Sequence, residues 1–229
     1  MMVIPMQSNA LIVDKFAVLW SILADLILLL YVIPVYNMVF FIVKEKEQRV
    51  KESMRMMGLT DLPYWLSWLC YYTIINTVTA TLAWSILSIN VFVYSTQFYI
   101  FMWIWLYGQS LFGQIIFIQS LFSKSKYAGI VATVVYFLCP FGNIPILSGT
   151  SPYWAKLVIS IIPQTNLYQS AFWICDFEGI GLGLTRSTAW ENRYNYSAGE
   201  GFVLYGVGGL LWLILGLYLD AVIPTEYGT

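Results

Sequence analysis

The sequence has 229 residues, of which 59% are hydrophobic and 10% are charged, and its formal net charge is −1. A soluble domain normally carries about a quarter charged residues, so this composition, with a mean hydropathy of +0.72, excludes an ordinary water-soluble protein and indicates lipid as the main solvent. The near-neutral charge excludes nucleic acid as a partner, and the absence of histidine removes the usual base of Ser-His and Cys-His catalytic sites.

Residues that could support catalysis or bind a metal are sparse and scattered. The three cysteines, Cys70, Cys139 and Cys175, lie far apart in apolar runs and form no CxxC pair of the kind found in zinc or redox sites. Serine and threonine residues have no neighbouring base. The sequence therefore predicts no catalytic residue, no metal site and no cofactor bound by this chain itself.

Long apolar stretches run through the whole chain. A helix needs about 20 apolar residues to cross the hydrocarbon core, and in lipid each backbone group must be satisfied within its own helix. The sequence therefore predicts an all-α, polytopic transmembrane helical bundle, with residues 1–229 forming a single transmembrane domain of about five spans. The predicted spans lie near residues 16–43, 65–93, 98–122, 127–147 and 202–219.

Two polar residues of the first span are candidate contacts for a substrate or an ion. Asp25 is the only acid well inside a predicted span, and the cost of burying an ionisable group in a membrane makes such a residue a functional candidate. Its place near the outer end of the span leaves a solvated carboxylate as the alternative. Asn37 is neutral, and hydrogen bonding between helices is the alternative role for it.

A charged segment, residues 44–59, joins the first two spans and is predicted to form an amphipathic helix. Val50, Met54 and Met57 recur at helical spacing and would form one apolar stripe. Gly58 can end this helix, because glycine readily adopts the left-handed conformation found at helix ends.

The same segment has two possible roles. Glu47 and Lys51 are spaced as a helical ion pair, which fits a solvated helix at the membrane surface that attracts anionic lipid. Exposed methionines also form a deformable docking surface for a partner protein. A helix held between two spans could pass the motion of such a partner into the membrane.

Basic residues gather in two loops, at residues 44–55 and 124–126. Cytoplasmic loops of membrane proteins are enriched in Lys and Arg, so both loops are predicted to be cytoplasmic. The opposite side receives the sequon Asn195-Tyr196-Ser197, which makes Asn195 a candidate glycosylation site. With five spans, the N-terminus would lie outside and the C-terminus in the cytoplasm.

Residues 152–175 are apolar but are interrupted at Pro163, Gln164, Thr165 and Asn166. Proline disfavours helix at the residue before it and cannot donate a backbone hydrogen bond. We therefore predict two short helices that meet at a polar turn, as a re-entrant hairpin entering from the exoplasmic face. A crossing helix is the alternative, and it would move the sequon to the cytoplasm.

The last span contains three glycines on one face, Gly206, Gly209 and Gly216. Small residues on one face of a membrane helix allow another helix to approach closely. We therefore predict that these three glycines serve packing.

Four segments, in order along the chain, resemble landmarks of A-subfamily ABC transporters. EKEQRVKESMRMMGL followed by WLSW resembles that family's loop between the second and third helices of a membrane domain, and LFSKSK resembles its short FFSK loop. FEGIGLGL resembles its acidic exoplasmic stretch, and YLDAVIPTEYG resembles the motif that leads out of its last helix. These segments begin at Glu45, Leu121, Phe177 and Tyr218.

The resemblance implies a role for each end of the bundle. Residues 44–59 would act as a coupling helix against a nucleotide-binding domain, and the hairpin would dip in from the outer face. The implied partners are a nucleotide-binding domain, a second membrane half and lipid, with ATP and Mg bound by the partner domain. The coupling residues implied in this way are Glu47, Val50, Lys51, Met54, Met57 and Gly58.

The chain departs from the family pattern at both ends. It contains no GxxxxGK[ST] phosphate-binding loop, and neither a nucleotide-binding domain nor a large exoplasmic domain is expected within it. Its function would be ATP-driven transport of lipid or an amphipathic substrate, with ATP hydrolysed elsewhere. The alternative is a structural membrane subunit that retains the fold without ATPase coupling. The expected location is the plasma membrane or an endomembrane.

Overall fold

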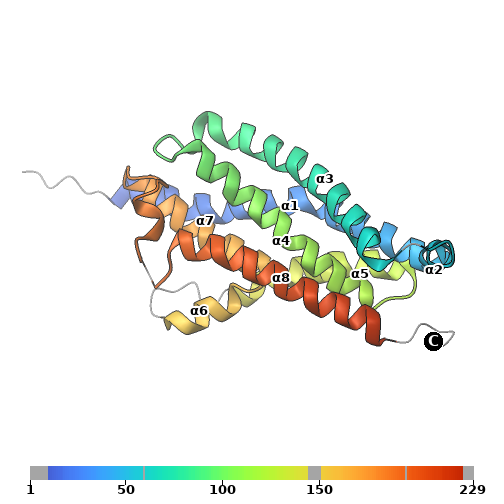
Figure 1. Ribbon diagram of the computed structural model, residues 1–229. Helices are drawn as coiled ribbons and strands as arrows, with labels where there is room; N and C mark the ends of the chain where they lie inside the picture. Colours follow the sequence, from blue (N-terminus) through green and yellow to red (C-terminus); the bar gives the residue numbers. More distant parts are fainter. Residues whose placement is uncertain (1–9, 59, 144–150, 194, 224–229) are drawn as a thin grey trace, which may run out of the picture.

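The structure is a computed structural model that describes residues 10–58, 60–143, 151–193 and 195–223, with the side chains of residues 10–19, 89–90 and 142–143 outside the description. Within these ranges the chain forms helices and no named strand, which confirms the all-α prediction. Figure 1 shows the long helices lying side by side along one common direction.

Five helices lie side by side along the bundle, and further helices and turns connect them. The five are α1 (Ala10–Glu47), α3 (Asp61–Asn90), α4 (Gln97–Ser120), α5 (Ser125–Leu138) and α8 (Ala198–Val222). The remaining helices are α2 (Val50–Met56), α6 (Tyr153–Ile159), α7 (Pro163–Gly179) and two 3-10 turns, η1 (Cys139–Asn143) and η2 (Thr188–Trp190).

Three of the described helices are long and apolar enough to cross a membrane, whereas the sequence predicted about five spans. They are Trp20–Glu47 within α1, α4 and α8. Helix α3 has 30 residues, but its tryptophan, tyrosine and threonine residues lower its hydropathy below that of a typical span. Helix α5 continues into η1 as a shorter apolar helix, Ser125–Phe141. The rest of the predicted fourth span, residues 144–147, lies outside the described residues.

Helices α6 and α7 occupy the predicted hairpin, but the polar residues do not form its turn. The turn lies at residues 160–162, and Pro163 is the first residue of α7, a position where its missing N–H would have no partner in any case. Gln164 and Asn166 therefore fall in the first turn of α7, where both are fully buried.

Buried polar side chains of α7 form hydrogen bonds to neighbouring segments, although Gln164 Oε1 has no partner among the described residues. The Gln164 amide nitrogen donates to Gln114 Oε1 of α4 at 2.6 Å, and Asn166 Nδ2 donates to the Gly201 carbonyl of α8 at 2.9 Å. Tyr196 Oη donates to Asn166 Oδ1 at 2.6 Å. Since an unpaired polar group in a membrane protein interior is costly, these bonds fix α7 against both neighbours.

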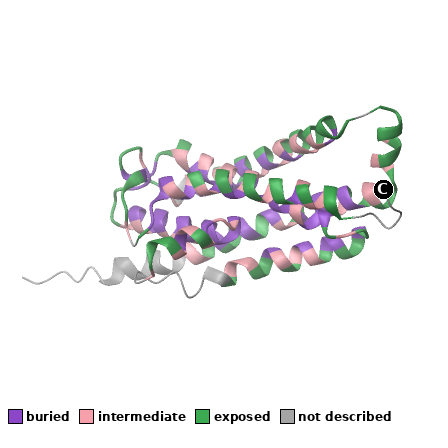
Figure 2. Cartoon of the chain, turned by 60° about the horizontal axis from the view of Figure 1, so that its bottom comes forward, coloured by how far each residue is buried: buried purple, intermediate pink, exposed green. Residues whose placement is uncertain are grey.

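Helix α4 lies at the centre of the bundle and packs closely against α8. Trp103 and Tyr107 of α4 are fully buried, and Figure 2 shows buried residues gathered on inner faces with exposed residues outside. A Cβ on Gly113 would lie 2.1 Å from the Gly209 carbonyl oxygen of α8. The two backbones therefore touch where glycine permits it, as small residues allow in membrane helix pairs.

Two glycines of α8 make a matched test of this contact. A Cβ on Gly216 would lie 2.6 Å from the Phe117 backbone nitrogen, whereas one on Gly206 would meet nothing within 4 Å, so Gly206 is not part of the predicted packing face. We expect Gly216→Ala to lower the free energy of unfolding by about 1–3 kcal/mol through overpacking. Gly206→Ala should leave it unchanged or raise it by up to about 1 kcal/mol. Thermal unfolding in detergent measures both, and equal midpoints would contradict this packing.

At the end of the bundle away from α2, one buried carboxylate joins two loops. Glu178, 3% exposed, accepts hydrogen bonds from the Tyr94 backbone N–H and from Ser95 Oγ, both at 2.6 Å. Ser95 Oγ also accepts from the Leu184 N–H at 2.8 Å. Gly183 has φ +62, and a Cβ there would lie 2.4 Å from the Tyr94 carbonyl carbon. The GIGLGL stretch thus needs glycine where it meets the loop between α3 and α4.

Candidate functional site

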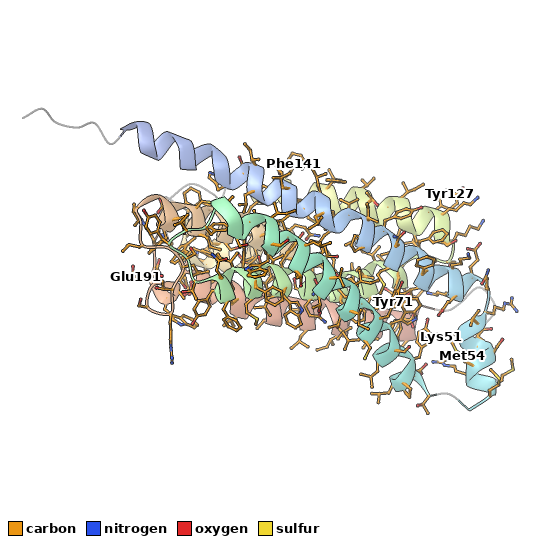
Figure 3. All side chains as sticks on the ribbon, turned by 90° about the horizontal axis from the view of Figure 1, so that it is seen from above. Lys51, Met54, Tyr71, Tyr127, Phe141 and Glu191 are labelled. Atoms are coloured by element: carbon orange, nitrogen blue, oxygen red, sulfur yellow. The ribbon has the colours of Figure 1, made fainter. Side chains whose placement is uncertain are left out.

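The charged segment predicted as one coupling helix over residues 44–59 is interrupted. Helix α1 continues to Glu47, Arg49 adopts a left-handed conformation with φ +56, and α2 begins at Val50. Gly58 has φ +94 just beyond the end of α2, as expected of a residue that ends a helix; Leu59 lies outside the described residues. The break turns α2 away from α1 at the end of the bundle (Figure 3).

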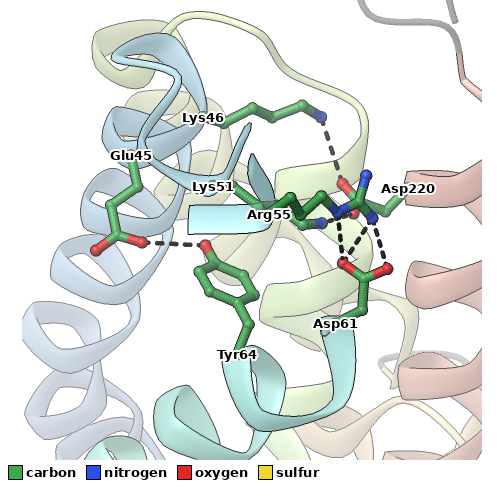
Figure 4. Close-up of polar contacts among 7 residues, drawn as sticks. All are labelled: Glu45, Lys46, Lys51, Arg55, Asp61, Tyr64 and Asp220. Atoms are coloured by element: carbon green, nitrogen blue, oxygen red, sulfur yellow. Dashed lines mark hydrogen bonds and ion pairs between the residues drawn. The ribbon is translucent and has the colours of Figure 1, made fainter. Parts of the chain in front are cut away.

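One carboxylate of α8 binds two lysines from this segment. Lys51 Nζ donates to Asp220 Oδ2 at 2.7 Å, and Lys46 Nζ lies 3.5 Å from Asp220 Oδ1. The Asp220 side chain is 12% exposed, so these charges are partly shielded from solvent and interact more strongly than surface pairs do. Figure 4 shows both lysines pointing at Asp220. The end of α1, α2 and the end of α8 are thereby joined.

Glu47 does not pair with Lys51 as its spacing predicted, but accepts hydrogen bonds from the start of α5. The Ser125 backbone N–H and Ser125 Oγ donate to Glu47 Oε2 at 3.1 Å and 2.7 Å. The first N–H groups of a helix have no partner within the helix, so a carboxylate there stabilises it. Glu47 therefore connects the segment to the loop that resembles FFSK.

Two further contacts connect this end of the bundle to α3. Arg55 binds Asp61 through Nε at 2.9 Å and Nη2 at 2.5 Å, and this carboxylate raises the pKa of Arg55. Both side chains are about half exposed, so the pair adds little stability. Tyr64 Oη donates to Glu45 Oε2 at 3.1 Å. The Arg55–Asp61 pair thus joins α2 to the start of α3, and the Tyr64–Glu45 hydrogen bond joins α3 to the end of α1 (Figure 4).

The apolar stripe of α2 divides between the bundle and solvent. Val50 and Met54 are half buried, whereas Met57 is 79% exposed and Met56 is 83% exposed. The exposed pair is therefore Met56 and Met57, not the predicted Met54 and Met57. Met56 ends α2 and Met57 directly follows it, so two exposed methionines form a deformable contact surface at the end of a helix held by ion pairs.

The two candidate contacts for a substrate or ion are not brought together. Asp25 accepts a hydrogen bond from Tyr168 Oη of α7, and Asn37 lies exposed further along α1. At a rise of about 1.5 Å per residue, the two residues are about 18 Å apart along the helix. They do not form a common site.

The sequon lies at the end of the bundle opposite α2. Asn195 is exposed, has φ +56, and donates from Nδ2 to the Ser151 carbonyl at 3.2 Å. Ser197 begins α8 through a capping box in which its side chain accepts from the Glu200 N–H and its own N–H is bound by the Glu200 carboxylate. Ser197 of the sequon thus also caps the start of α8.

The chemistry of the α2 end is electrostatic and mechanical. Among the described residues, no group of three or more His, Cys, Asp or Glu side chains is arranged to hold a metal ion. The three cysteines are free thiols. What the site offers is a surface helix joined to α8 by the partly buried ion pair of Lys51 and Asp220, through which a force applied to α2 would reach the bundle.

Sequence reasoning did not identify two important residues of this site. Asp220 stands out in the sequence only as part of the final motif, although an acid at the end of an apolar span near basic loops indicates an ion pair. Met56 lies off the predicted stripe, about 200° around α2 from Met54, so it faces outward where Met54 faces the bundle. The rest of the final motif, from Pro224 onward, lies outside the described residues.

Comparisons with known proteins identify the family to which this chain belongs. A family model described as ABC-2 family transporter protein matches residues 4–219. The human cholesterol transporter ABCA5 is 30% identical over 204 residues, which cover 84% of this chain and 12% of the relative. Human ATP-binding cassette sub-family A member 13 is 25% identical over 215 residues, which cover 89% of this chain and 4% of the relative.

A plant relative also matches most of this chain. ABC transporter A family member 11 of Arabidopsis thaliana is 25% identical over 203 residues, which cover 82% of this chain and 21% of the relative. The chain thus spans about a fifth or less of the length of these relatives. The apolar helices and the family together identify an integral membrane protein. The chain belongs to the ABC-2 transporter family and forms a membrane domain like those of the A-subfamily ABC transporters.

Proposed function

We propose that this chain is the membrane domain of an ATP-driven transporter of lipid or another amphipathic substrate, and that α2 receives the motion of a nucleotide-binding domain. The single observation that carries this proposal is the arrangement of α2, which exposes Met56 and Met57 while Lys51 holds it to Asp220 of α8. ATP and Mg would be bound by the partner domain. A second membrane half would complete the transport path.

A continuous set of contacts leads from α2 to the hairpin. Lys51 binds Asp220 at one end of α8, and further along α8 the Trp212 Nε1–H donates to the Ile161 carbonyl in the turn between α6 and α7 at 3.2 Å. A Cβ on Gly208 would lie 2.5 Å from the same carbonyl oxygen. A shift of α8 would therefore move the hairpin, which gives nucleotide-driven motion a route to the opposite end of the bundle.

The proposal includes a membrane orientation. Helices α3 and α5 would cross with α1, α4 and α8, since all five lie side by side (Figure 1). The α2 end carries the basic loops and would face the cytoplasm. The hairpin and Asn195 would then lie on the exoplasmic side, where Asn195 is a glycosylation site, in the plasma membrane or an endomembrane.

The double substitution Met56→Asp and Met57→Asp tests the coupling surface. Two carboxylates would replace the apolar contact, and we expect ATP-driven lipid transfer in proteoliposomes to fall at least about tenfold, which corresponds to about 1.4 kcal/mol of lost contact energy. Folding should be preserved because both side chains are about four-fifths exposed. The matched control is Ile180→Asp with Leu182→Asp at the opposite end, where both residues are 51% exposed.

The outcome separates the proposed transporter from a structural subunit. A folded double variant with normal transport would show that α2 does not receive the driving motion. A native particle that contains many other subunits and no nucleotide-binding domain would replace the transport proposal with the structural alternative.

A further inference from the structure

A groove of about 590 Å³ opens beside α2, between the neighbouring ends of α1 and α3. The hydrogen bond between Tyr64 and Glu45 described above is part of its wall. Its wall combines aromatic rings with one base and one acid. The residues that carry the argument are Lys44, Glu45, Tyr64, Trp68 and Tyr71, of which Tyr71 is labelled in Figure 3.

The aromatic wall is suited to a cationic group. Trp68 is half buried and Tyr71 is 46% exposed, and their rings meet edge to face with centroids 5.8 Å apart. Aromatic faces attract ammonium groups, and quaternary ammonium groups are bound by such clusters. An ammonium group of the protein already lies against adjacent rings, because Lys51 Nζ is 5.4 Å from the Tyr64 ring and 4.9 Å from the Trp65 ring.

The charged residues of the groove match a zwitterion. Lys44 is exposed and offers an ammonium group to a phosphate. Glu45, its neighbour, is half buried and is oriented by the hydrogen bond from Tyr64 Oη at 3.1 Å. A phosphate joined to a quaternary ammonium could place its anion at Lys44 and its cation between Glu45 and the rings.

The surface that leads out of the groove along α3 is suited to acyl chains. Ile74 and Val78 follow Tyr71 at helical spacing on the same face of α3, and they are 66% and 57% exposed. Both belong to a helix that the proposed orientation places in the membrane. A lipid whose headgroup occupied the groove could therefore lay its tails along this apolar face.

We propose that this groove binds the headgroup of a zwitterionic phospholipid of the phosphatidylcholine type, drawn from the leaflet at the α2 end. The site rests on the proposed function and deepens it by naming the substrate class. Lys44 contacts the phosphate, and Glu45 with the rings of Trp68 and Tyr71 holds the quaternary ammonium. The position beside α2 places a bound lipid next to the element that receives the driving motion.

Lipid binding can be measured without ATP. The protein, purified together with its natural partners, is titrated with phosphatidylcholine, phosphatidylglycerol or cholesterol, and retained lipid is counted by native mass spectrometry. We expect phosphatidylcholine to bind in preference to the other two lipids. Tyr71→Leu should weaken its binding about two- to fivefold, Lys44→Gln should weaken it as well, and Tyr71→Phe should preserve it because the ring remains.

Tyr127→Leu is the matched control, since Tyr127 is 64% exposed on α5 at the same end of the bundle (Figure 3), and it should bind phosphatidylcholine normally. Unchanged binding in Tyr71→Leu, or equal binding of phosphatidylglycerol or cholesterol, would overturn the proposed site. Because no ATP is present, failure of the coupling proposal does not alter this readout. Conversely, normal transport in a Tyr71→Leu variant that has lost binding would reject the groove as an entry site and leave the proposed function intact.

Discussion

Asp220→Ala is expected to abolish coupled transport and to destabilise the α2 end of the bundle. The substitution leaves Lys46 and Lys51, which are 21% and 20% exposed, without their shared carboxylate. Losing hydrogen bonds to a charged group costs about 1.5–3 kcal/mol, and we expect the free energy of unfolding to fall by that amount. Thermal unfolding in detergent and ATP-driven lipid transfer measure the two effects.

The control for Asp220→Ala lies a short distance away in the same site. Asp61 binds Arg55, but both side chains are about half exposed, and exposed ion pairs contribute little. Asp61→Ala should therefore unfold at nearly the wild-type temperature and retain most of its transport. If both variants behave alike, the contact between α2 and α8 is not the connection that transmits motion.

Glu178→Ala is expected to have the largest effect on stability at the opposite end of the bundle. The substitution removes the partner of the Tyr94 N–H and of Ser95 Oγ, which are bound at 2.6 Å each. Because buried donors left without partners are costly, we expect the free energy of unfolding to fall by about 3 kcal/mol. Thermal unfolding measures the change in stability. A second readout is the fraction of protein that stays in the monodisperse peak after heating.

Glu191→Ala serves as the comparison for Glu178→Ala. Glu191 lies at the same end of the bundle (Figure 3) and its side chain is exposed, so its removal should shift the unfolding temperature little. Glu178→Gln should be intermediate, because an amide can accept one of the two hydrogen bonds. A Glu178→Ala protein as stable as Glu191→Ala would show that the two loops do not depend on this carboxylate.

Local signals predicted where most helices lie. Apolar runs predicted the five helices that lie side by side, and the proline at Pro163 separated α6 from α7. Gly58 ended the charged segment as expected. These features depend on residues close in sequence, and therefore the sequence itself contains them.

Features that depend on distant partners could not be read from the sequence. Lys51 and Asp220 are 169 residues apart, and spacing alone favoured Glu47 as the partner of Lys51. The break before α2 was also hidden, because arginine has no preference for the left-handed conformation that Arg49 adopts.

The most direct test of the central claim is a crosslinking measurement at Met57. A photo-crosslinking amino acid is placed at this position in the protein purified with its natural partners, and the crosslinked product is identified by mass spectrometry. A control experiment places the same amino acid at the position of Trp154, which is 68% exposed on α6 at the other end of the bundle. We expect crosslinks from Met57, and not from Trp154, to a nucleotide-binding domain with a phosphate-binding loop. Crosslinks from Met57 exclusively to proteins or lipids without such a domain would contradict the assignment of α2 as the coupling element.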